Sequence, residues 1–363
     1  MIAGSIDQFL AAASPGDAVT TEALLIRNAL RRTGPAEVYA EHVHPDLVGE
    51  VRTLDSPTGT DTGLSIYHAS IGCPAVVAAV TEAAAPLVVR YHNITPAEFF
   101  RPDHAEFADL LDLGRDELRA LAPRAALGLG DSRFNTDELI GWGYTNGQVS
   151  PLVVDLEQLV GIEPDPDTEN HLQVMYDDDF VVLVVGQVLP HKRVDLAVQA
   201  LDMIATHHNP GVRAIIAGGS PLADYPQAIH RFIIQLGLHT VWATGWVPDR
   251  QLAAFFRRAD VLLLTSQHEG FSVPILEAMA HGVPVVASNH GAIADTAGDT
   301  ALILDRVATA ADFAEGVLEV LGSRHLRDTM IERGQRRAAE LSMDRTLPEF
   351  FRHIAALAPR ALT

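Results

Sequence analysis

Four short apolar runs in the second half of the chain constrain the fold more than any other feature. They are nearly continuously apolar, have the length of single strands, and cover 180–188, 212–219, 259–266 and 283–288. Helical patterns such as VDLAVQALDMIA at 194–205 separate them. Strands that are apolar on both faces are typical of a parallel sheet covered by helices on each side. The second half is therefore predicted to be a doubly wound α/β domain.

The first half of the chain repeats this alternation. Its start, MIAGSIDQFLAAA, lacks a basic region and is interrupted by Asp7, so we expect a first strand there and not a signal peptide. Further buried strands are predicted at 64–69, 86–92 and 124–132, and helices at 21–34 and 105–123. Two such blocks predict an α/β fold made of two doubly wound domains.

The predicted domain boundary lies in a polar, acidic and proline-bearing segment at 161–179, which is expected to be a linker with the entry to the second domain. We assign residues 1–155 to an N-terminal domain and residues 156–344 to a C-terminal domain. The last residues, 345–363, have the amphipathic pattern of a separate helix. Because ligands of doubly wound sheets bind at the carboxyl ends of strands, the site residues are expected there.

The composition excludes two classes of partner. A formal net charge of −21 argues against nucleic acid and against an anionic membrane, because both need a broad basic surface. No apolar run reaches the roughly 18 to 20 residues of a transmembrane segment. The single Cys73 leaves no internal disulfide and fits a reducing cytoplasm. The acidic run 177–179 precedes its strand, so we expect solvated charges there and predict no metal site.

One basic residue stands apart from the others. Lysine and arginine together number 26, and Lys192 in GQVLPHKRVD is the one lysine of the chain. It follows directly after an apolar run, where a strand is expected to end. A compact ammonium at a strand end is suited to binding an anion in a chain whose overall charge repels one.

The segment SQHEGFSVPILEAMAHGVPVVAS at 266–288 predicts a second element of an anion site. Ser272 is placed to cap a helix that ends at Gly282, so the preceding loop presents free backbone N–H groups at a strand end. Glu269 and Glu277 flank this loop. Bare carboxylates repel a phosphate, so we expect them to accept hydrogen bonds from sugar hydroxyls on either side of it.

Glu269 and Glu277, within HEGFSVPILEAMAHGVPVVAS, make the chain resemble the retaining nucleotide-sugar glycosyltransferases of family 4, the group 1 glycosyl transferases, which have the GT-B fold. Other motifs follow in the family's order: PGDAV at 15–19, RYHNITPAEFF at 90–100, GDSRFNTDEL at 130–139, VGQVLPHKR at 185–193, ATGWVPDRQLAAFFRRADVLLLTS at 243–266 and NHGAIADTAG at 289–298. The resemblance thus spans most of the chain and implies two Rossmann-like domains that face each other across a cleft.

The resemblance implies roles for the motif residues of the second half. Lys192 would hold the donor diphosphate, and Glu269 would bind hydroxyls of the transferred sugar. Glu277 would bind the ribose of the nucleoside. The backbone amides that would touch the donor sugar and phosphate belong to Gly270, Phe271 and Ser272.

The resemblance also implies roles in the first half. Gly16 would let a loop approach the donor, and His92 would contact the transferred sugar near the reacting centre. The helix at 345–363 would cross back to pack on the N-terminal domain. One departure concerns the donor: where the family usually has arginine, this chain has Gln187, and Arg193 is the residue that could compensate for the lost charge.

The resemblance implies a hexosyltransferase-type, metal-independent and cofactor-free enzyme that moves a sugar from a nucleoside-diphosphate sugar to an acceptor hydroxyl with retention of configuration. The acceptor is a saccharide, a lipid-linked molecule or a small molecule, and the oligomeric state is open. Two alternatives remain: a nucleotide-sugar epimerase of the same architecture and a non-catalytic sugar-nucleotide binding protein. We expect the protein to be cytoplasmic.

Overall fold

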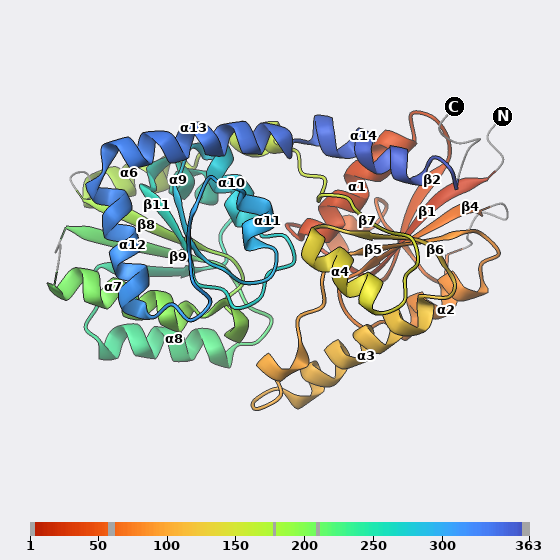
Figure 1. Ribbon diagram of the computed structural model, residues 1–363, viewed down its shortest axis with the longest axis horizontal. Coiled ribbons are helices and arrows are strands. Elements are labelled where there is room, and N and C mark those ends of the chain that lie inside the picture. Colours follow the sequence, from red (N-terminus) through yellow and green to blue (C-terminus); the bar gives the residue numbers. More distant parts are fainter. Residues whose placement is uncertain (1–3, 57–61, 177–178, 208–210, 358–363) are drawn as a thin grey trace. The chain divides into compact units, whose positions relative to one another are not determined.

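The computed structural model describes residues 4–56, 62–176, 179–207 and 211–357 (Figure 1). The chain divides into two compact units. The first consists of residues 1–154 and 341–363, and the second of residues 155–340. Each unit contains one parallel sheet and several helices, which confirms the predicted α/β class with two domains.

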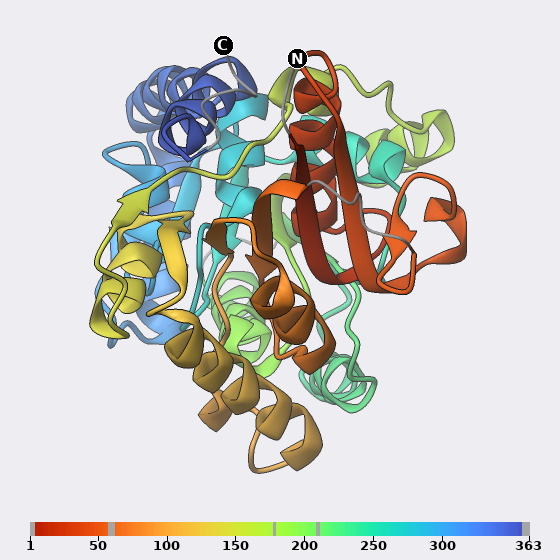
Figure 2. The ribbon, with the colours of Figure 1, turned by 90° about the vertical axis from the view of Figure 1, so that its right-hand side faces the viewer.

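The sheet of the first unit has seven strands in the order β3-β2-β1-β4-β5-β6-β7, and every neighbouring pair is parallel. Helix α1 packs beside β1 and β2 (Figure 2). The strands are β1 (Ser5–Ala13), β2 (Ala36–Val43), β3 (Arg52–Thr53), β4 (Thr62–Ala69), β5 (Leu87–Tyr91), β6 (Ala125–Gly130) and β7 (Gly147–Val149). The helices are α1 (Ala18–Leu30), α2 (Pro74–Glu82), α3 (Ala105–Leu121), α4 (Arg133–Gly141) and α14 (Met343–Ile354), with 3-10 turns η1 (Pro45–Leu47) and η2 (Ala97–Phe99).

The sheet of the second unit has six parallel strands in the order β10-β9-β8-β11-β12-β13, the order of a Rossmann fold. Its strands are β8 (Phe180–Val185), β9 (Val212–Ala217), β10 (Val241–Gly245), β11 (Val261–Leu264), β12 (Val285–Ser288) and β13 (Leu302–Leu304). Its helices are α5 (Leu156–Val160), α6 (Pro166–Tyr176), α7 (Val194–His207), α8 (Asp224–Gln235), α9 (Asp249–Arg258), α10 (Val273–His281), α11 (Ile293–Ala297), α12 (Ala310–Gly322) and α13 (Arg324–Glu340), with the 3-10 turn η3 (Pro190–Lys192).

The apolar runs form the buried centres of both units, as their composition predicts. Val182 on β8 and Leu263 on β11 are completely buried against α7 and α12. In the second unit α7 neighbours α12, and α10 neighbours α13 (Figure 1). The last helix, α14, inserts Phe350 and Ile354 into the core of the first unit beside Ile6 and Ile26. The apolar face of α14 therefore stabilises the first unit by burial in its core.

The structure differs from the expected linker at 161–179. Pro166–Tyr176 forms helix α6, which begins after Asp165, whose carboxylate accepts a hydrogen bond from the Thr168 backbone N–H at 2.9 Å. The acidic and proline residues that suggested a linker are the start signals of a helix. Asp177 and Asp178 lie outside the described residues. Asp179 pairs with Arg213 at 2.6 Å, so this acid acts within the unit and is not solely a solvated charge.

The topology marks where a ligand is expected to bind in each sheet. Strand order reverses between β8 and β11 in the second unit and between β1 and β4 in the first. Loops that leave adjacent strands in opposite directions open a crevice at such a point. The segments that follow β8 and β11 carry Lys192 and Glu269, and the segment that follows β1 carries Gly16.

Candidate active site

The loop after β8 presents Lys192 from a single 3-10 turn. Pro190 begins η3, and the Lys192 backbone N–H donates to the Leu189 carbonyl at 2.9 Å. Thr265, directly after β11, donates its hydroxyl to the carbonyls of Lys192 at 3.1 Å and Arg193 at 2.8 Å. The two strand ends are thus tied together, and the backbone that carries the lysine is held in place.

The side chains of Lys192 and Glu269 meet at this crevice. The Nζ of Lys192 lies 2.7 Å from Oε1 of Glu269, and the same oxygen accepts the Ser266 hydroxyl at 2.7 Å. The lysine side chain is 22% exposed and the glutamate side chain 7% exposed. An ammonium has three donors, so Lys192 can keep this bond and still direct an N–H toward an anion.

The backbone of Glu269 is held by the loop after β12. The Ala292 N–H donates to the Glu269 carbonyl at 2.9 Å. A Cβ placed on Gly291 would come within 2.2 Å of that carbonyl oxygen, and Gly291 has a φ of +58°. Only glycine fits this close approach. The loop within NHGAIADTAG at 289–298 therefore has a definite structural role.

The start of α10 provides the expected helix N-terminus. Ser272 occupies the N-cap position with a φ of 74°, a left-handed conformation that is uncommon for a residue with a side chain. Its side chain makes no capping hydrogen bond, which corrects the expected cap. The Ser272 Oγ is buried without a hydrogen-bond partner. Strained backbone and an unsatisfied buried hydroxyl are features of ligand sites.

The other expected loop residues lie beside this N-terminus. Phe271 is 7% exposed, and its carbonyl accepts the Thr296 hydroxyl from α11. Gly270 is half-buried between Phe271 and Glu269. The loop is therefore anchored on both sides, which keeps its backbone in one conformation.

Glu277 lies on α10, one turn into the helix, and is half-buried. Burial raises the pKa of its carboxyl group to about 8, and the nearby negative charge of Asp249 raises it further. The group is protonated at neutral pH in the absence of a ligand. A hydroxyl that donates to the ionised carboxylate would lower this pKa again.

The structure does not place Arg193 where it was expected to compensate for the charge missing at Gln187. Gln187 and Lys192 line one small crevice at the ends of β8 and β11. Arg193 lines a different pocket of about 330 Å³, together with Gln267, His290 and Arg306. Its guanidinium is bound to Asp195, with the shortest contact at 3.0 Å. The guanidinium of Arg193 therefore binds Asp195 and does not line the crevice that Lys192 and Gln187 line.

In the first unit, Gly16 lies in the turn between β1 and α1 with a φ of +74°. No atom lies within 4 Å of a Cβ built there, so the backbone conformation and not space requires glycine. Asp17 caps α1 by accepting from the Thr20 N–H at 2.8 Å. The approach of this loop to a donor remains a prediction.

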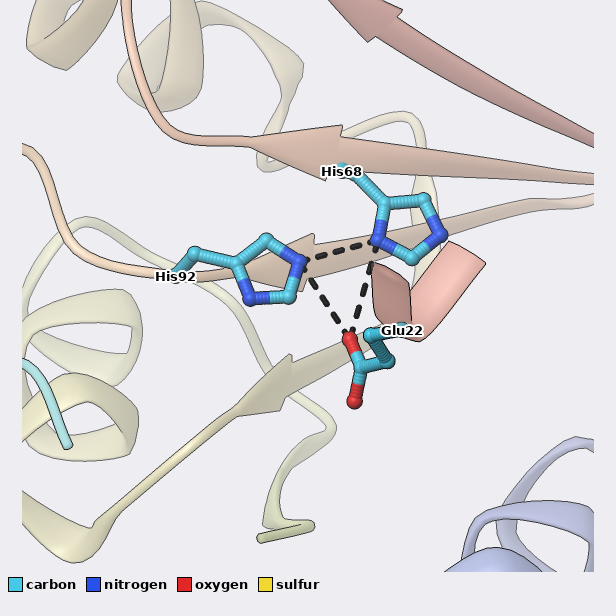
Figure 3. A group of neighbouring side chains, drawn as sticks. All are labelled: Glu22, His68 and His92. Carbon is cyan, nitrogen blue, oxygen red and sulfur yellow. Dashed lines mark hydrogen bonds and ion pairs between the residues drawn. The ribbon is translucent and has the colours of Figure 1, made fainter. Parts of the chain in front are cut away.

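His92 follows directly after β5 and is enclosed by protein. Its Nδ1 lies 2.9 Å from Oδ2 of Asp131, and its Nε2 lies 2.9 Å from Nδ1 of His68. Figure 3 shows the rings of His68 and His92 with the carboxylate of Glu22. The His92 side chain is 3% exposed. Both ring nitrogens are engaged within the first unit, and the predicted contact of His92 with a sugar remains a prediction.

Several residues of these clusters were not expected from the sequence. Ser266 and Thr265 are ordinary strand-end hydroxyls, and only their position after β11 could have suggested a role. Asp131 lies within the quoted motif GDSRFNTDEL, but its partner His92 is 39 residues away. Glu22, His68 and Arg90 belong to segments that were classified as helix or buried strand. Pairing between distant elements was the missing information.

The second unit of the chain is similar in sequence to known glycosyltransferases. Residues 168–337 match the family described as Glycosyl transferases group 1. The chain is 32% identical over 151 residues to the D-inositol 3-phosphate glycosyltransferase of Mycobacteroides abscessus, which covers 40% of this chain and 32% of that protein. It is 28% identical over 164 residues to the O-antigen chain mannosyltransferase B of Escherichia coli, covering 45% and 42%. The matched part thus spans less than half the length of these relatives.

Solved structures extend the similarity to both units. The structure of HepE from Anabaena in complex with UDP and glucose has a TM-score of 0.76 and 20% identity, and the alignment covers 97% of this chain and 99% of that chain. At this identity the likeness shows the fold, and it confirms the predicted GT-B fold. Among the described residues, no helix combines the length and apolar character needed to cross a membrane.

Proposed function

Since residues 168–337 belong to the group 1 glycosyl transferases, we propose that the protein transfers a sugar from a nucleoside-diphosphate sugar to an acceptor hydroxyl, with retention of configuration and without a metal ion or other cofactor. The observation that carries the proposal is the Lys192–Glu269 pair at the switch point of a Rossmann sheet, beside the N-terminus of α10. A cation, a carboxylate and the backbone N–H groups of a helix N-terminus together suit a sugar attached to a diphosphate.

The reaction asks the protein to stabilise the diphosphate that departs. In the proposed complex, Lys192 directs an N–H to the diphosphate, and the start of α10 supplies backbone N–H groups and the positive end of its dipole. The buried and unpartnered Oγ of Ser272 is a further donor for a phosphate oxygen. These donors are fixed before the reaction, so little reorganisation accompanies bond breaking.

The carboxylates distinguish the two ends of the donor. Glu269 accepts hydrogen bonds from hydroxyls of the transferred sugar, and Glu277 accepts from the ribose. The acceptor hydroxyl attacks from the face that the diphosphate leaves, and the departing phosphate takes its proton. Gln187 contributes an amide and no charge, so Lys192 is the main cation for the diphosphate.

The donor class is supported by similar proteins. The HepE structures are described as complexes with UDP, UDP-glucose, or UDP and glucose. A relative from Mycolicibacterium smegmatis is described as GDP-mannose-dependent. For this chain we propose a uridine or guanosine diphosphate hexose as donor, a saccharide, lipid-linked or small-molecule hydroxyl as acceptor, and a cytoplasmic location.

A donor panel tests the proposal. Melting temperature is measured with UDP-, GDP- and ADP-hexoses, because a ligand at about 100 times its Kd stabilises the native state by about 2.7 kcal/mol. We expect one donor to raise the melting temperature of the wild type and not that of Lys192→Ala. A panel in which no nucleotide sugar raises it contradicts the proposal. Arg324→Ala, an exposed change in the same unit, serves as the matched control.

The identified donor then decides between reactions. Incubation with acceptors should release nucleoside diphosphate, and NMR of the product should show the anomeric configuration of the donor. An altered sugar nucleotide in the absence of an acceptor would indicate an epimerase. Tight binding without turnover for any acceptor would indicate a sugar-nucleotide binding protein.

A further inference from the structure

A closed cluster of charged and polar side chains lies at the carboxyl ends of β4, β5 and β6. His92 stands at its centre, with Asp131 on one side of its ring and His68 on the other. Arg90 binds both carboxylates: its NH2 lies 2.6 Å from Oε1 of Glu22 and 3.0 Å from Oδ1 of Asp131. None of these side chains is more than 3% exposed. Every proton in the cluster must therefore be accounted for by its neighbours.

Gln8 determines which nitrogen of His68 carries the proton. The Nε2 of Gln8 donates to the Ala23 carbonyl at 2.9 Å, so the Oε1 of Gln8 faces Nε2 of His68, also at 2.9 Å. An amide oxygen only accepts, so His68 donates through Nε2. Burial lowers the pKa of His68 well below its usual range, and the charge of nearby His92 lowers it further. His68 is thus neutral, and its Nδ1 offers a lone pair.

Asp131 determines one proton of His92. Its carboxylate is paired with Arg90 and faces Nδ1 of His92 at 2.9 Å. A carboxylate accepts and does not donate, so His92 donates through Nδ1. The remaining nitrogen of His92, Nε2, lies 2.9 Å from the lone pair on Nδ1 of His68. Two lone pairs at this distance repel each other unless a cation lies between them.

The orientation of the two rings indicates that this cation is a proton and not a metal ion. Glu22, His68 and His92 offer three atoms within 4.8 Å of one another, a spacing that also suits a metal ion. The ring planes of His68 and His92, however, differ by only 4°, and their centroids lie 5.1 Å apart. The distance between the ring centroids exceeds the 2.9 Å between the two nitrogens by about one ring radius for each ring. Both nitrogens therefore lie on the line that joins the centroids, and their lone pairs point at each other. Such axes suit a linear N–H···N bond, whereas metal ligands converge on a point off that line.

The charge balance leads to the same conclusion. Glu22 and Asp131 carry two negative charges, and Arg90 supplies one positive charge. Glu22 also accepts the Val153 N–H at 2.8 Å, and its Oε2 lies 3.5 Å from Nε2 of His92. A neutral His92 would leave one negative charge uncompensated in a site without water access, at a large desolvation cost. A proton on Nε2 of His92 makes the cluster neutral.

We infer that His92 is a doubly protonated imidazolium whose hydrogen bonds hold together the carboxyl ends of β4, β5 and β6. It acts as a positioning residue, which neither gives nor takes a proton in the proposed transfer. The same hydrogen bonds also fix the adjacent turn. Asn93 has a left-handed φ of 78° and donates to Asn135 at 2.9 Å, so a fixed His92 keeps this strained turn in place. Only the statement about the role of His92 in sugar transfer rests on the proposed function.

NMR of protein with ¹⁵N-labelled histidine tests the protonation directly, without donor or turnover. The chain has 16 histidines, and the signal missing from His92→Gln identifies the ring. Near neutral pH we expect both nitrogens of His92 to carry protons, and His68 to carry one on Nε2 alone. A His92 ring with a single proton, or a stoichiometric metal in the purified protein, would overturn the inference.

Two variants keep the test decisive. Asp131→Asn offers an amide donor to Nδ1 of His92, so we expect His92 to become singly protonated, on Nε2. Asp137→Asn, an exposed change on α4, is the control and should leave both protons of His92 in place. His68→Gln still offers an oxygen to accept from Nε2, so both protons of His92 should remain. A doubly protonated ring in folded Asp131→Asn contradicts the role of Asp131.

The kinetic arm uses the identified donor. Asp131→Asn should lower kcat with little change in donor Kd, and the pH profile of kcat should keep its wild-type shape, because a positioning residue does not exchange protons in the reaction. A limb of the wild-type pH profile that disappears in His92→Gln would show proton transfer by His92. If no donor is turned over, the NMR result still stands or falls by itself.

Discussion

The two units carry polar clusters at equivalent places, the strand ends beside a reversal of strand order, but the clusters differ in what their charges bind. In the first unit, Arg90 and Glu22 are completely buried and satisfy each other. In the second, Lys192 is 22% exposed, and the Ser272 hydroxyl has no partner. The first cluster is closed on itself, whereas the second has donors available for a ligand.

The difference shows how one architecture serves two purposes. A buried, neutral cluster holds strand ends rigidly because removing any member leaves a charge in a medium that solvates it poorly. A partly exposed cation beside a helix N-terminus is suited to attract an anion even in a chain with a net charge of −21. The non-glycine residues with positive φ, among those described, are Asn93, Arg193 and Ser272, and each adjoins one of the two clusters. Backbone strain is thus concentrated where side chains must be held in one direction.

The largest effect is expected from breaking the closed cluster. Arg90→Leu removes one of the two positive charges that the buried carboxylates of Glu22 and Asp131 need, so the free energy of unfolding should fall by about 3–5 kcal/mol. Urea unfolding followed by circular dichroism measures it. Arg213→Leu, which breaks the partly exposed pair with Asp179, is the control and should cost no more than about 1 kcal/mol. Equal losses in the two variants would show that burial does not couple the charges of the first cluster.

The open cluster should respond in activity and not in stability. Lys192→Ala removes a charge-assisted hydrogen bond worth roughly 1.5–3 kcal/mol, so kcat/KM should fall about 10- to 150-fold with little change in melting temperature. Lys192→Arg should recover only part of the loss, because a guanidinium is longer, planar and forked. An arginine variant within about twofold of the wild type would mean that only a positive charge is needed there.

Glu277 sharpens the comparison through pH. Its pKa of about 8 means that the ligand-free protein holds it protonated at neutral pH, whereas the ionised carboxylate is the stronger acceptor for the proposed ribose hydroxyl. Affinity for the nucleoside diphosphate should therefore rise as pH increases through about 8, and this rise should be absent in Glu277→Gln. Titration calorimetry between pH 6 and 9 measures it. A pH-independent affinity in the wild type would remove Glu277 from the ribose site.

Stability should show the opposite trend with pH. Because the folded-state pKa of Glu277 lies above its ordinary value of 4.5, the folded state binds an extra proton between these two pH values, and the associated stability is lost progressively until the pH reaches about 8. The unfolding free energy of the wild type should therefore fall relative to that of Glu277→Gln as the pH rises from about 4.5 to about 8. Urea unfolding at a series of pH values gives the difference, and a constant value would contradict the burial of this carboxyl group.

The smallest effect is expected from a chelator. In the proposed reaction the diphosphate is held by Lys192 and the start of α10, so EDTA should leave turnover unchanged. The rate is measured with and without EDTA, and again after adding manganese. A loss that manganese restores would show that the open cluster needs a metal ion to complete it.

Much of the fold was readable from the sequence. The apolar runs predicted strands close to β4, β5, β6, β8, β9, β11 and β12, because a strand buried on both faces has to be apolar throughout. Short or mixed strands escaped notice: β2 alternates with glutamate and histidine, and β13 has only three residues. The segment 161–179 was misread because helix start signals and linker signals use the same residue types.

For the sites, the sequence by itself determined the residues that precede and follow each strand, which is why Lys192, Glu269 and the start of α10 could be named in advance. Local spacing and strand ends carry that information. Only the tertiary structure decided the pairings: Lys192 with Glu269, 77 positions apart, and Arg90 with Glu22, 68 positions apart. It also turned Arg193 toward Asp195 and enclosed His92 among Asp131, His68 and Glu22. The physical reason is that a hydrogen bond depends on distance and direction in space, which the order of strands in a sheet sets and which a single sequence does not contain.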